Sequence, residues 1–129
     1  MDQDALEVLV FFSGESCYGI DIEQIAYLAD PSPTQEAVSF EELMRSNVSQ
    51  QEGRRKRISV KGHEEILVLI PEPETVSNLS LRDIRPLPAV FKAAQPLGVW
   101  GLAQKEGRLI ILLDLYKNLQ FKELVRQAQ

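Results

Sequence analysis

Runs of apolar residues separated by short polar turns dominate this chain, and they predict a protein built mainly of β-strands. The stretch 6–22 is rich in β-forming residues on both sides of Ser13-Gly14-Glu15, and apolar side chains alternate towards its end, which predicts a hairpin. A similar pattern returns at 57–70, again around a glycine turn. Each hairpin is followed by a short tail of spaced apolar residues, so the two stretches look like copies of one unit.

The clearest hairpin lies near the C-terminus. Two apolar runs, 97–103 and 109–113, flank the polar link 104–107, which carries the glycine that hairpin turns favour. The second run does not alternate with polar residues, so we expect both faces of that strand to be buried. Asp114 then stands where a helix N-cap belongs, and the apolar spacing over 115–128 predicts an amphipathic C-terminal helix.

The sequence between the first two hairpins is mostly polar. Ser39 and Glu42 have the spacing of a capping box, which predicts a short helix near 39–46. The segment 46–57 ends in four consecutive cations, 54–57. We expect this segment to form a solvent-exposed loop between two subdomains, because no aromatic residues are interleaved with the cations as in a nucleic-acid patch.

Prolines mark the approach to the last hairpin. Pro86, Pro88 and Pro96 predict that this approach is extended and non-helical. Short strands bounded by Gly and Pro turns, with little helix elsewhere, favour a mainly β fold of small barrels. We therefore expect a single domain over 1–129, made of two barrel-like subdomains at about 1–50 and 57–129.

Composition narrows the function classes. The chain has 129 residues, of which 44% are hydrophobic and 26% charged, a balance typical of a folded globular domain. Its net charge of −5 disfavours nucleic acid and anionic lipid as partners. No apolar run approaches the roughly 20 residues of a membrane helix, and the acidic N-terminus lacks the basic start of a signal peptide. We expect a cytoplasmic protein without membrane insertion.

Candidate catalytic residues do not form a constellation. The only histidine, His63, falls at a hairpin turn, and the neighbouring Glu64 and Glu65 point to opposite faces of a strand. Cys17 lies in an apolar strand pattern and is interpreted as a buried small hydrophobic residue. With no phosphate loop, nucleophile elbow or metal-binding pair, the sequence predicts no enzyme, no cofactor and no metal site. Trp100 is either a core residue or an exposed aromatic anchor of an interface.

Taken together, several of these segments resemble the CheW-like adaptor domains of bacterial chemotaxis. The similarity covers roughly residues 8–119, and its most informative part is the closing hairpin, whose run of aliphatic residues is followed by Asp-Leu. The similar segments are 8–12, Tyr18-Gly-Ile-Asp-Ile22 with Ile25, 57–70, 81–88 and 101–115.

This resemblance implies two SH3-like β-barrel subdomains within a single CheW-like domain. It also implies a non-enzymatic adaptor or scaffold in signal transduction, which docks a CheA-type histidine kinase, chemoreceptors, or both. Contacts with these protein partners are expected at apolar residues near the groove that the subdomains share. The candidates are Ile22, Ile25, Leu28, Val76, Leu79 and Val99.

One departure from the family pattern changes this expectation. Family members commonly carry an Asn-aliphatic-Arg-Gly hairpin in their first half, and residues 28–54 contain no such segment. The first subdomain is therefore expected to be shortened, leaving its strands 6–12 and 17–22 partly without cover. We expect the C-terminal helix to shield them in part, and a homodimer or another partner to shield the rest. The alternative is a small-ligand-binding or regulatory β domain that has lost binding to the chemosensory array.

Overall fold

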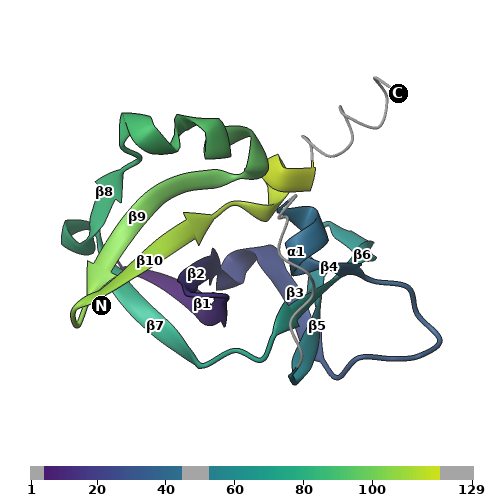
Figure 1. Cartoon of the computed structure of the whole chain (residues 1–129). Helices are drawn as coiled ribbons and strands as arrows, with labels where there is room; N and C mark the ends of the chain where they lie inside the picture. The colour runs from purple at the N-terminus through teal and green to yellow at the C-terminus, as the bar shows by residue number, and fades with distance from the viewer. Residues whose placement is uncertain (1–4, 45–52, 120–129) are drawn as a thin grey trace.

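The structure is a computed structural model that describes residues 5–44 and 53–119, and it is mainly β (Figure 1). One sheet has six strands in the order β7-β1-β2-β10-β9-β8. Its strands are β1 (Ala5–Ser13), β2 (Ser16–Asp21), β7 (Thr75–Ser80), β8 (Ile84–Pro86), β9 (Val99–Lys105) and β10 (Arg108–Leu113).

A second sheet has four strands in the order β3-β5-β6-β4. They are β3 (Ile25–Ala29), β5 (Arg55–Val60), β6 (His63–Pro71) and the two-residue β4 (Val38–Ser39). Short helices connect the strands: η1 (Ile22–Gln24), α1 (Phe40–Leu43), η2 (Leu81–Asp83) and η3 (Ala89–Leu97). No helix of the described ranges has the length and apolar character needed to cross a membrane.

Both sheets are curled as in SH3-like barrels, which confirms the predicted fold class (Figure 1). In each sheet the two edge strands follow one another along the chain. The edge strands β7 and β8 are joined by η2, and β3 and β4 are joined by the loop 30–37. A short connection between the two edges of one sheet forces that sheet to curl back towards itself.

The three hairpins form where the apolar pattern predicts them. The pairs β1–β2, β5–β6 and β9–β10 are all antiparallel. The last turn has positive φ at both central residues, 53° at Glu106 and 74° at Gly107, which is the geometry of a type I′ turn. That turn matches the right-handed twist of the flanking strands, so the sequence Lys-Glu-Gly-Arg positions this hairpin locally.

The division of the chain at 1–50 and 57–129 is not the division that the strands follow. The tail of each hairpin pairs with the other hairpin: β3 adds to β5, and β7 adds to β1. In addition, β10 pairs in parallel with β2, so the closing hairpin extends the first one. The four-stranded sheet therefore spans residues 25–71, and the six-stranded sheet is assembled from the two ends of the chain.

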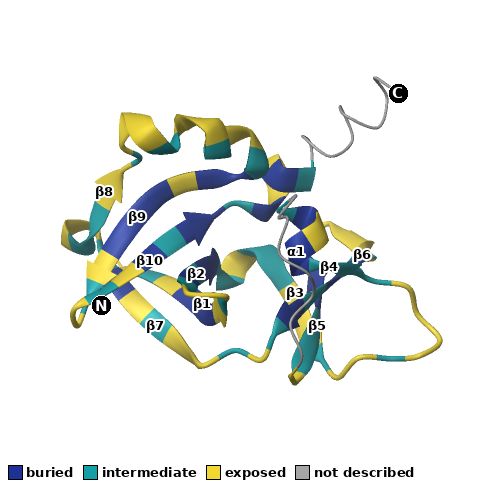
Figure 2. Cartoon of the chain, viewed as in Figure 1, coloured by how far each residue is buried: buried dark blue, intermediate teal, exposed yellow. Residues whose placement is uncertain are grey.

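Two hydrophobic clusters form the core (Figure 2). Along β1, Val8 and Val10 join a cluster inside the six-stranded sheet, whereas Leu9 and Phe11 join a cluster shared with the other sheet. Phe40 of α1 completes the shared cluster, with its ring edge-on to Phe11 at 4.9 Å between centroids. Alternate residues of β1 are buried on opposite faces of the sheet, and this explains why the sequence of β1 is a continuous apolar run.

The expectation that the first hairpin lacks cover is wrong. Its strands are flanked by β7 on one side and β10 on the other, and both of their faces are lined by buried residues. The start of the predicted C-terminal helix, 115–119, is present, and Leu115 is fully buried in the shared cluster. The rest of that helix lies outside the described residues. The first hairpin belongs to the six-stranded sheet, and the smaller sheet is the four-stranded one.

Three local expectations need correction. Only part of the last strand is buried on both faces, because Leu109 at its turn end is 51% exposed and Ile111 is half-buried. The run after Pro88 is a 3-10 helix, since Pro88 precedes the first turn as its N-cap, where its missing N–H is not needed, and Pro96 lies near the end. The basic run is not a loop, because Arg55 begins β5.

Candidate functional site

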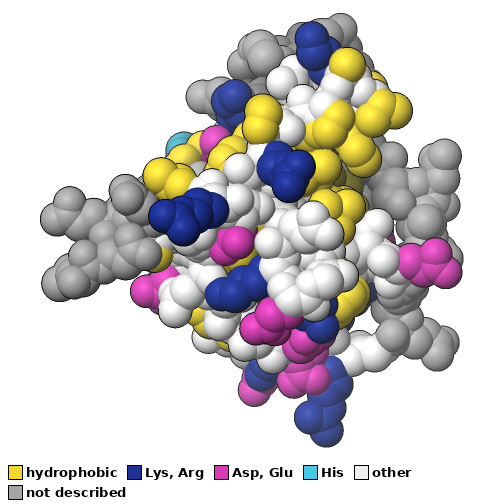
Figure 3. Space-filling view, turned by 90° about the vertical axis from the view of Figure 1, so that its left-hand side faces the viewer, with side chains coloured by type: hydrophobic (Ala, Val, Ile, Leu, Met, Phe, Trp, Pro, Cys, Tyr) yellow, Lys and Arg dark blue, Asp and Glu magenta, His cyan; other side chains and the backbone are white. Residues whose placement is uncertain are grey.

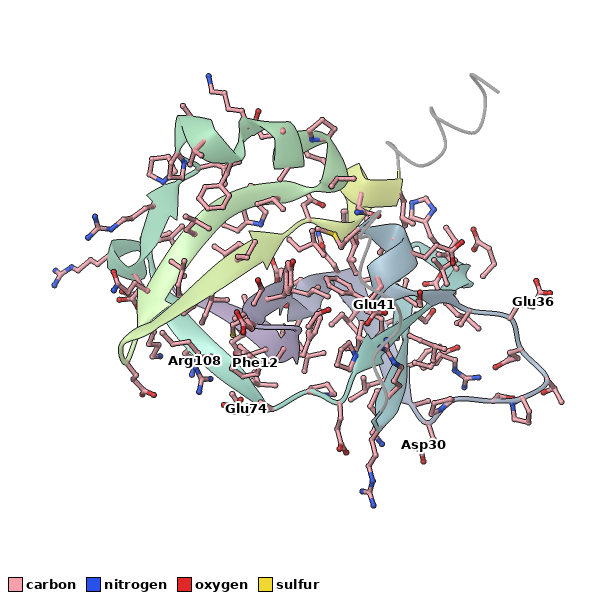
Figure 4. All side chains as sticks on the ribbon, viewed as in Figure 1. Phe12, Asp30, Glu36, Glu41, Glu74 and Arg108 are labelled. Atoms are coloured by element: carbon pink, nitrogen blue, oxygen red, sulfur yellow. The ribbon has the colours of Figure 1, made fainter. Side chains whose placement is uncertain are left out.

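The basic run contributes a buried ion pair instead of a solvated surface. Arg55 donates two hydrogen bonds to the Glu41 carboxylate, Nη1 at 3.0 Å and Nη2 at 2.5 Å. Their side chains are only 7% and 5% exposed. Ser39 caps α1 by accepting from the Glu42 amide at 3.2 Å, which confirms the predicted helix and fixes its orientation. Glu41 then points at β5, so the pair ties α1 to the four-stranded sheet (Figure 4).

A polar contact joins the two sheets where the chain passes from one to the other. Gln24, the last residue of η1, donates through Nε2 to Asp114 Oδ1 at 2.9 Å and accepts from the Leu115 amide at 2.9 Å. Asp114 Oδ1 also accepts from the amides of Tyr116 and Lys117, which confirms it as an N-cap. The start of the C-terminal helix is thus fixed against η1 and the adjoining β3.

Three of the candidate contact residues lie on this same segment. Ile22 and Ile25 are half-buried and pack against the shared cluster, while Leu28 at the far end of β3 is 45% exposed. Tyr27, which the sequence interpretation did not select, is 43% exposed beside it. We refer to Ile22, Ile25, Tyr27 and Leu28 as the β3 surface.

The other three candidates are not brought to that surface. Leu79 is fully buried inside the six-stranded sheet, and Val99 is 4% exposed within the shared cluster, so neither is available to a partner. Both assignments are wrong, because a single apolar pattern does not distinguish a core position from a groove. Val76 is 52% exposed, but it lies on β7, opposite Leu9 of β1.

A second surface lies beside β8 and β9, on the left-hand side of Figure 1, and that side faces the viewer in Figure 3. An open hollow of about 530 Å³ has a floor formed by Leu102, Gln104 and Leu109. Its rim carries Arg82 and Arg85, for which no ion pair is present within the described residues. Pro86, Pro88 and Ala103 complete the lining. We call these eight residues the β8 hollow; no pattern along the chain predicted it.

By contrast, the cation at the end of β10 is neutralised. Arg108 lies 5.1 Å from the centre of the Phe12 ring and donates to Glu74 Oε1 at 2.7 Å, as the neighbouring sticks in Figure 4 show. Phe12 is therefore a partly exposed aromatic ring with its own cation, and we do not count it among the docking residues.

The remaining residues singled out by the sequence carry no visible catalytic arrangement. Cys17 is buried, as expected, and burial raises the pKa of its thiol, although the Arg108 charge acts in the opposite direction. His63 is exposed at the start of β6. Trp100 is 39% exposed, which favours the reading as a surface aromatic. In the part of the chain that the structure describes, no group of three potential ligands is placed to hold a metal ion.

Comparison with known proteins identifies the fold. No protein-family model matches the sequence, and no curated protein matches it. Among solved structures, the chain is similar to the crystal structure of the scaffolding protein TtCheW from Thermoanaerobacter tengcongensis, with a TM-score of 0.68. The match covers 84% of this chain and 88% of that one at 16% identity. The chain has a CheW-like fold.

The segment between β3 and β5 is where the sequence predicts a shortened first half. Between β3 and β5, the described residues hold only the loop 30–37, the two-residue β4 and α1. Phe40 and the buried pair of Glu41 with Arg55 fix α1 in this region. Among the residues that the structure describes, the four-stranded sheet ends at β3, which pairs with β5 alone.

Proposed function

We propose that the chain is a non-enzymatic, cytoplasmic adaptor of a bacterial chemosensory system that docks a CheA-type histidine kinase, chemoreceptors, or both. The observation that carries this proposal is the likeness of fold to a scaffolding protein over most of both chains. A scaffold acts through surfaces that bind other proteins, so the exposed apolar residues are where its function is sought.

The β3 surface is the docking site that the geometry supports best. Leu28 and Tyr27 are exposed, while Ile22 and Ile25 anchor the same segment to the core. The hydrogen bond from Gln24 to Asp114 holds the start of this segment against the beginning of the C-terminal helix. Exposed apolar groups on a rigid support favour binding, because little side-chain or backbone order has to be created when the partner docks. Val76 on β7 is a second, separate contact candidate.

The test is capture of purified partners from the same organism: the regulatory region of a CheA-type kinase and the cytoplasmic tip of a chemoreceptor. Leu28→Glu and Val76→Glu are compared with the wild-type chain and with Leu109→Glu, a control at an equally exposed leucine of the β8 hollow. We expect Leu28→Glu to weaken binding at least about tenfold while the control keeps it. Failure of the wild-type chain to capture either partner would overturn the adaptor proposal.

The β8 hollow supports the alternative function, a small-ligand-binding or regulatory domain. Its volume of about 530 Å³ falls within the range of small-molecule sites, and two arginines beside the leucines and Gln104 of the lining suit an anionic ligand. A thermal-shift screen of small carboxylates and phosphate esters tests this alternative. A stabilising ligand whose effect disappears in Leu109→Glu, together with no kinase or receptor capture, would favour it over the adaptor.

A further inference from the structure

The two sheets have four edges, and three of them are protected against pairing with another chain. On β7, the ammonium group of Lys105 hydrogen-bonds the Asn78 carbonyl. On the other side of that sheet, β8 has only three residues and ends in Pro86. In the second sheet, β4 has only two residues. Short strands, prolines and lysines are the devices by which proteins prevent edge-to-edge association.

The fourth edge, β3, has none of these devices. Its sequence Ile-Ala-Tyr-Leu-Ala contains no charge, no proline and no glycine, and among residues 5–44 and 53–119 its one paired neighbour is β5. The Ile25 amide donates to the Ile22 carbonyl at the end of η1, and within the described residues no backbone hydrogen bond other than those to β5 involves residues 26–29. Residues 26–28 are also exposed. An uncharged edge strand of this kind is a template for an added strand.

The charges at the two ends of β3 indicate what kind of strand fits. Glu23 precedes it and Asp30 follows it, with side chains that are 81% and 83% exposed. Their cationic partners, Lys61 and Lys56, lie on the β5 side of the strand. Each exposed carboxylate at the two ends of β3 therefore belongs to an ion pair, and it is the net charge of −5 on the chain that favours a basic partner for this apolar edge.

We propose that β3 binds an extended segment of a partner protein by strand addition, and that this segment has an apolar centre flanked by basic residues. A second copy of this chain fits less well, because antiparallel pairing of β3 with itself brings Glu23 of one copy towards Asp30 of the other. The net charge of −5 on each copy adds to that repulsion. The inference rests on the proposed docking role of β3 and specifies its mode.

The test uses the full chain and a synthetic probe, a short peptide of alternating Val and Thr with two lysines at each end. We expect this peptide to slow amide hydrogen exchange across residues 25–29 by at least about tenfold, with little change elsewhere. A peptide with the same centre and glutamates at both ends should bind at least about tenfold more weakly.

A proline variant separates backbone pairing from side-chain contact. Successive N–H groups of a strand point to opposite sides, so one of Tyr27 and Leu28 directs its N–H to the free edge. Tyr27 and Leu28 are each replaced by proline in turn. The variant with an unchanged thermal midpoint keeps its pairing with β5 and therefore carries the proline at the position whose N–H faces the free edge. That variant should lose peptide binding, whereas Tyr27→Phe should keep it.

Three results would overturn the inference. The first is a basic peptide that leaves exchange over 25–29 unchanged. The second is equal binding of the glutamate-flanked peptide. The third is protection of β3 that rises with protein concentration alone, accompanied by a dimer in sedimentation, which would make the second copy the occupant. Capture of the kinase or receptor is scored separately, so the adaptor proposal and the strand-addition mode can each fail alone.

Discussion

At the scale of single residues, the buried pair of Glu41 and Arg55 is the polar contact with the largest expected effect on stability. Replacing Glu41 by Ala leaves an uncompensated guanidinium in a site where the side chains are only 5–7% exposed. Breaking a buried pair in this way typically costs about 3–5 kcal/mol. We expect urea denaturation of Glu41→Ala to show a loss of that order.

The neighbouring residue supplies a matched control. Glu42 is exposed on the same helix, so Glu42→Ala should change the free energy of unfolding by less than about 1 kcal/mol. A double variant, Glu41→Leu with Arg55→Met, should recover much of the stability, because two apolar groups of similar size leave no unpaired charge. Equal losses for Glu41→Ala and Glu42→Ala would show that the pair is solvated.

The thiol of Cys17 gives a second prediction at this scale. Burial raises its pKa above the ordinary value, so near pH 8 the folded chain holds it as the unreactive thiol, whereas a free cysteine is partly thiolate. Ellman's reagent should therefore modify the native protein slowly and the urea-unfolded protein at the rate of a model thiol. Rapid modification of the native chain, with its circular dichroism unchanged, would contradict the burial of this residue.

At the scale of elements, the sequence predicts what is local and misses what depends on pairing partners. The hairpins, the capped helix at Ser39 and the N-cap at Asp114 are confirmed, because each is set by neighbouring residues. The exchange of β3 and β7 between the sheets is not encoded locally, since each tail has the same apolar spacing wherever it pairs. Leu79 was misassigned for that reason.

The candidate site was predictable to the same extent. The exposed position of Leu28 and the half-buried positions of Ile22 and Ile25 agree with a surface segment, but Tyr27 was overlooked. The β8 hollow could not be predicted, because its lining comes from η2, β8, β9 and β10, which are separate segments of the sequence.

The junction between β9 and the C-terminal helix supports another prediction for an element. Gly98 has a φ of 99°, and a Cβ built there would lie 2.4 Å from the Asp114 carbonyl oxygen. Gly98→Ala should therefore destabilise the chain by several kcal/mol, beyond the roughly 1–2 kcal/mol of a left-handed conformation alone. Gly107→Ala is the control, since φ is 74° there and nothing lies within 4 Å. The difference between the thermal midpoints of Gly98→Ala and Gly107→Ala measures the destabilisation that comes from the steric clash at Gly98.

Gln24 allows a double-variant test of the same junction. Gln24→Ala removes both of its hydrogen bonds and should cost about 1–3 kcal/mol, while Gln95→Ala on the exposed side of η3 should cost little. In the double variant of Gln24→Ala and Asp114→Ala, the loss of unfolding free energy should be smaller than the sum of the two single losses, because the residues share one contact. Strict additivity in chemical denaturation would mean that the two groups act independently.

At the scale of the whole molecule, the exchanged strands make each sheet depend on the other. The four-stranded sheet cannot keep β3 if the first hairpin is lost, since that hairpin holds the preceding residues in the six-stranded sheet. The shared cluster reinforces this dependence, because it contains Leu9, Phe11 and Ile20 from one sheet and Ile58, Val60 and Val68 from the other. The six-stranded sheet has a second cluster of its own, but among the described residues the fully buried hydrophobic residues of the four-stranded sheet belong to the shared cluster.

We therefore expect the two sheets to unfold together in one transition. The single Trp100 reports on the six-stranded sheet through its fluorescence, and amide exchange over β5 and β6 reports on the four-stranded sheet. In a urea titration the two probes should give the same midpoint and the same slope, as two-state unfolding requires. If β5 and β6 lost protection at lower urea than the Trp100 signal, the sheets would be separable units. The shared cluster would then be an interface between subdomains, and the docking segment at β3 would lie on the less stable of the two.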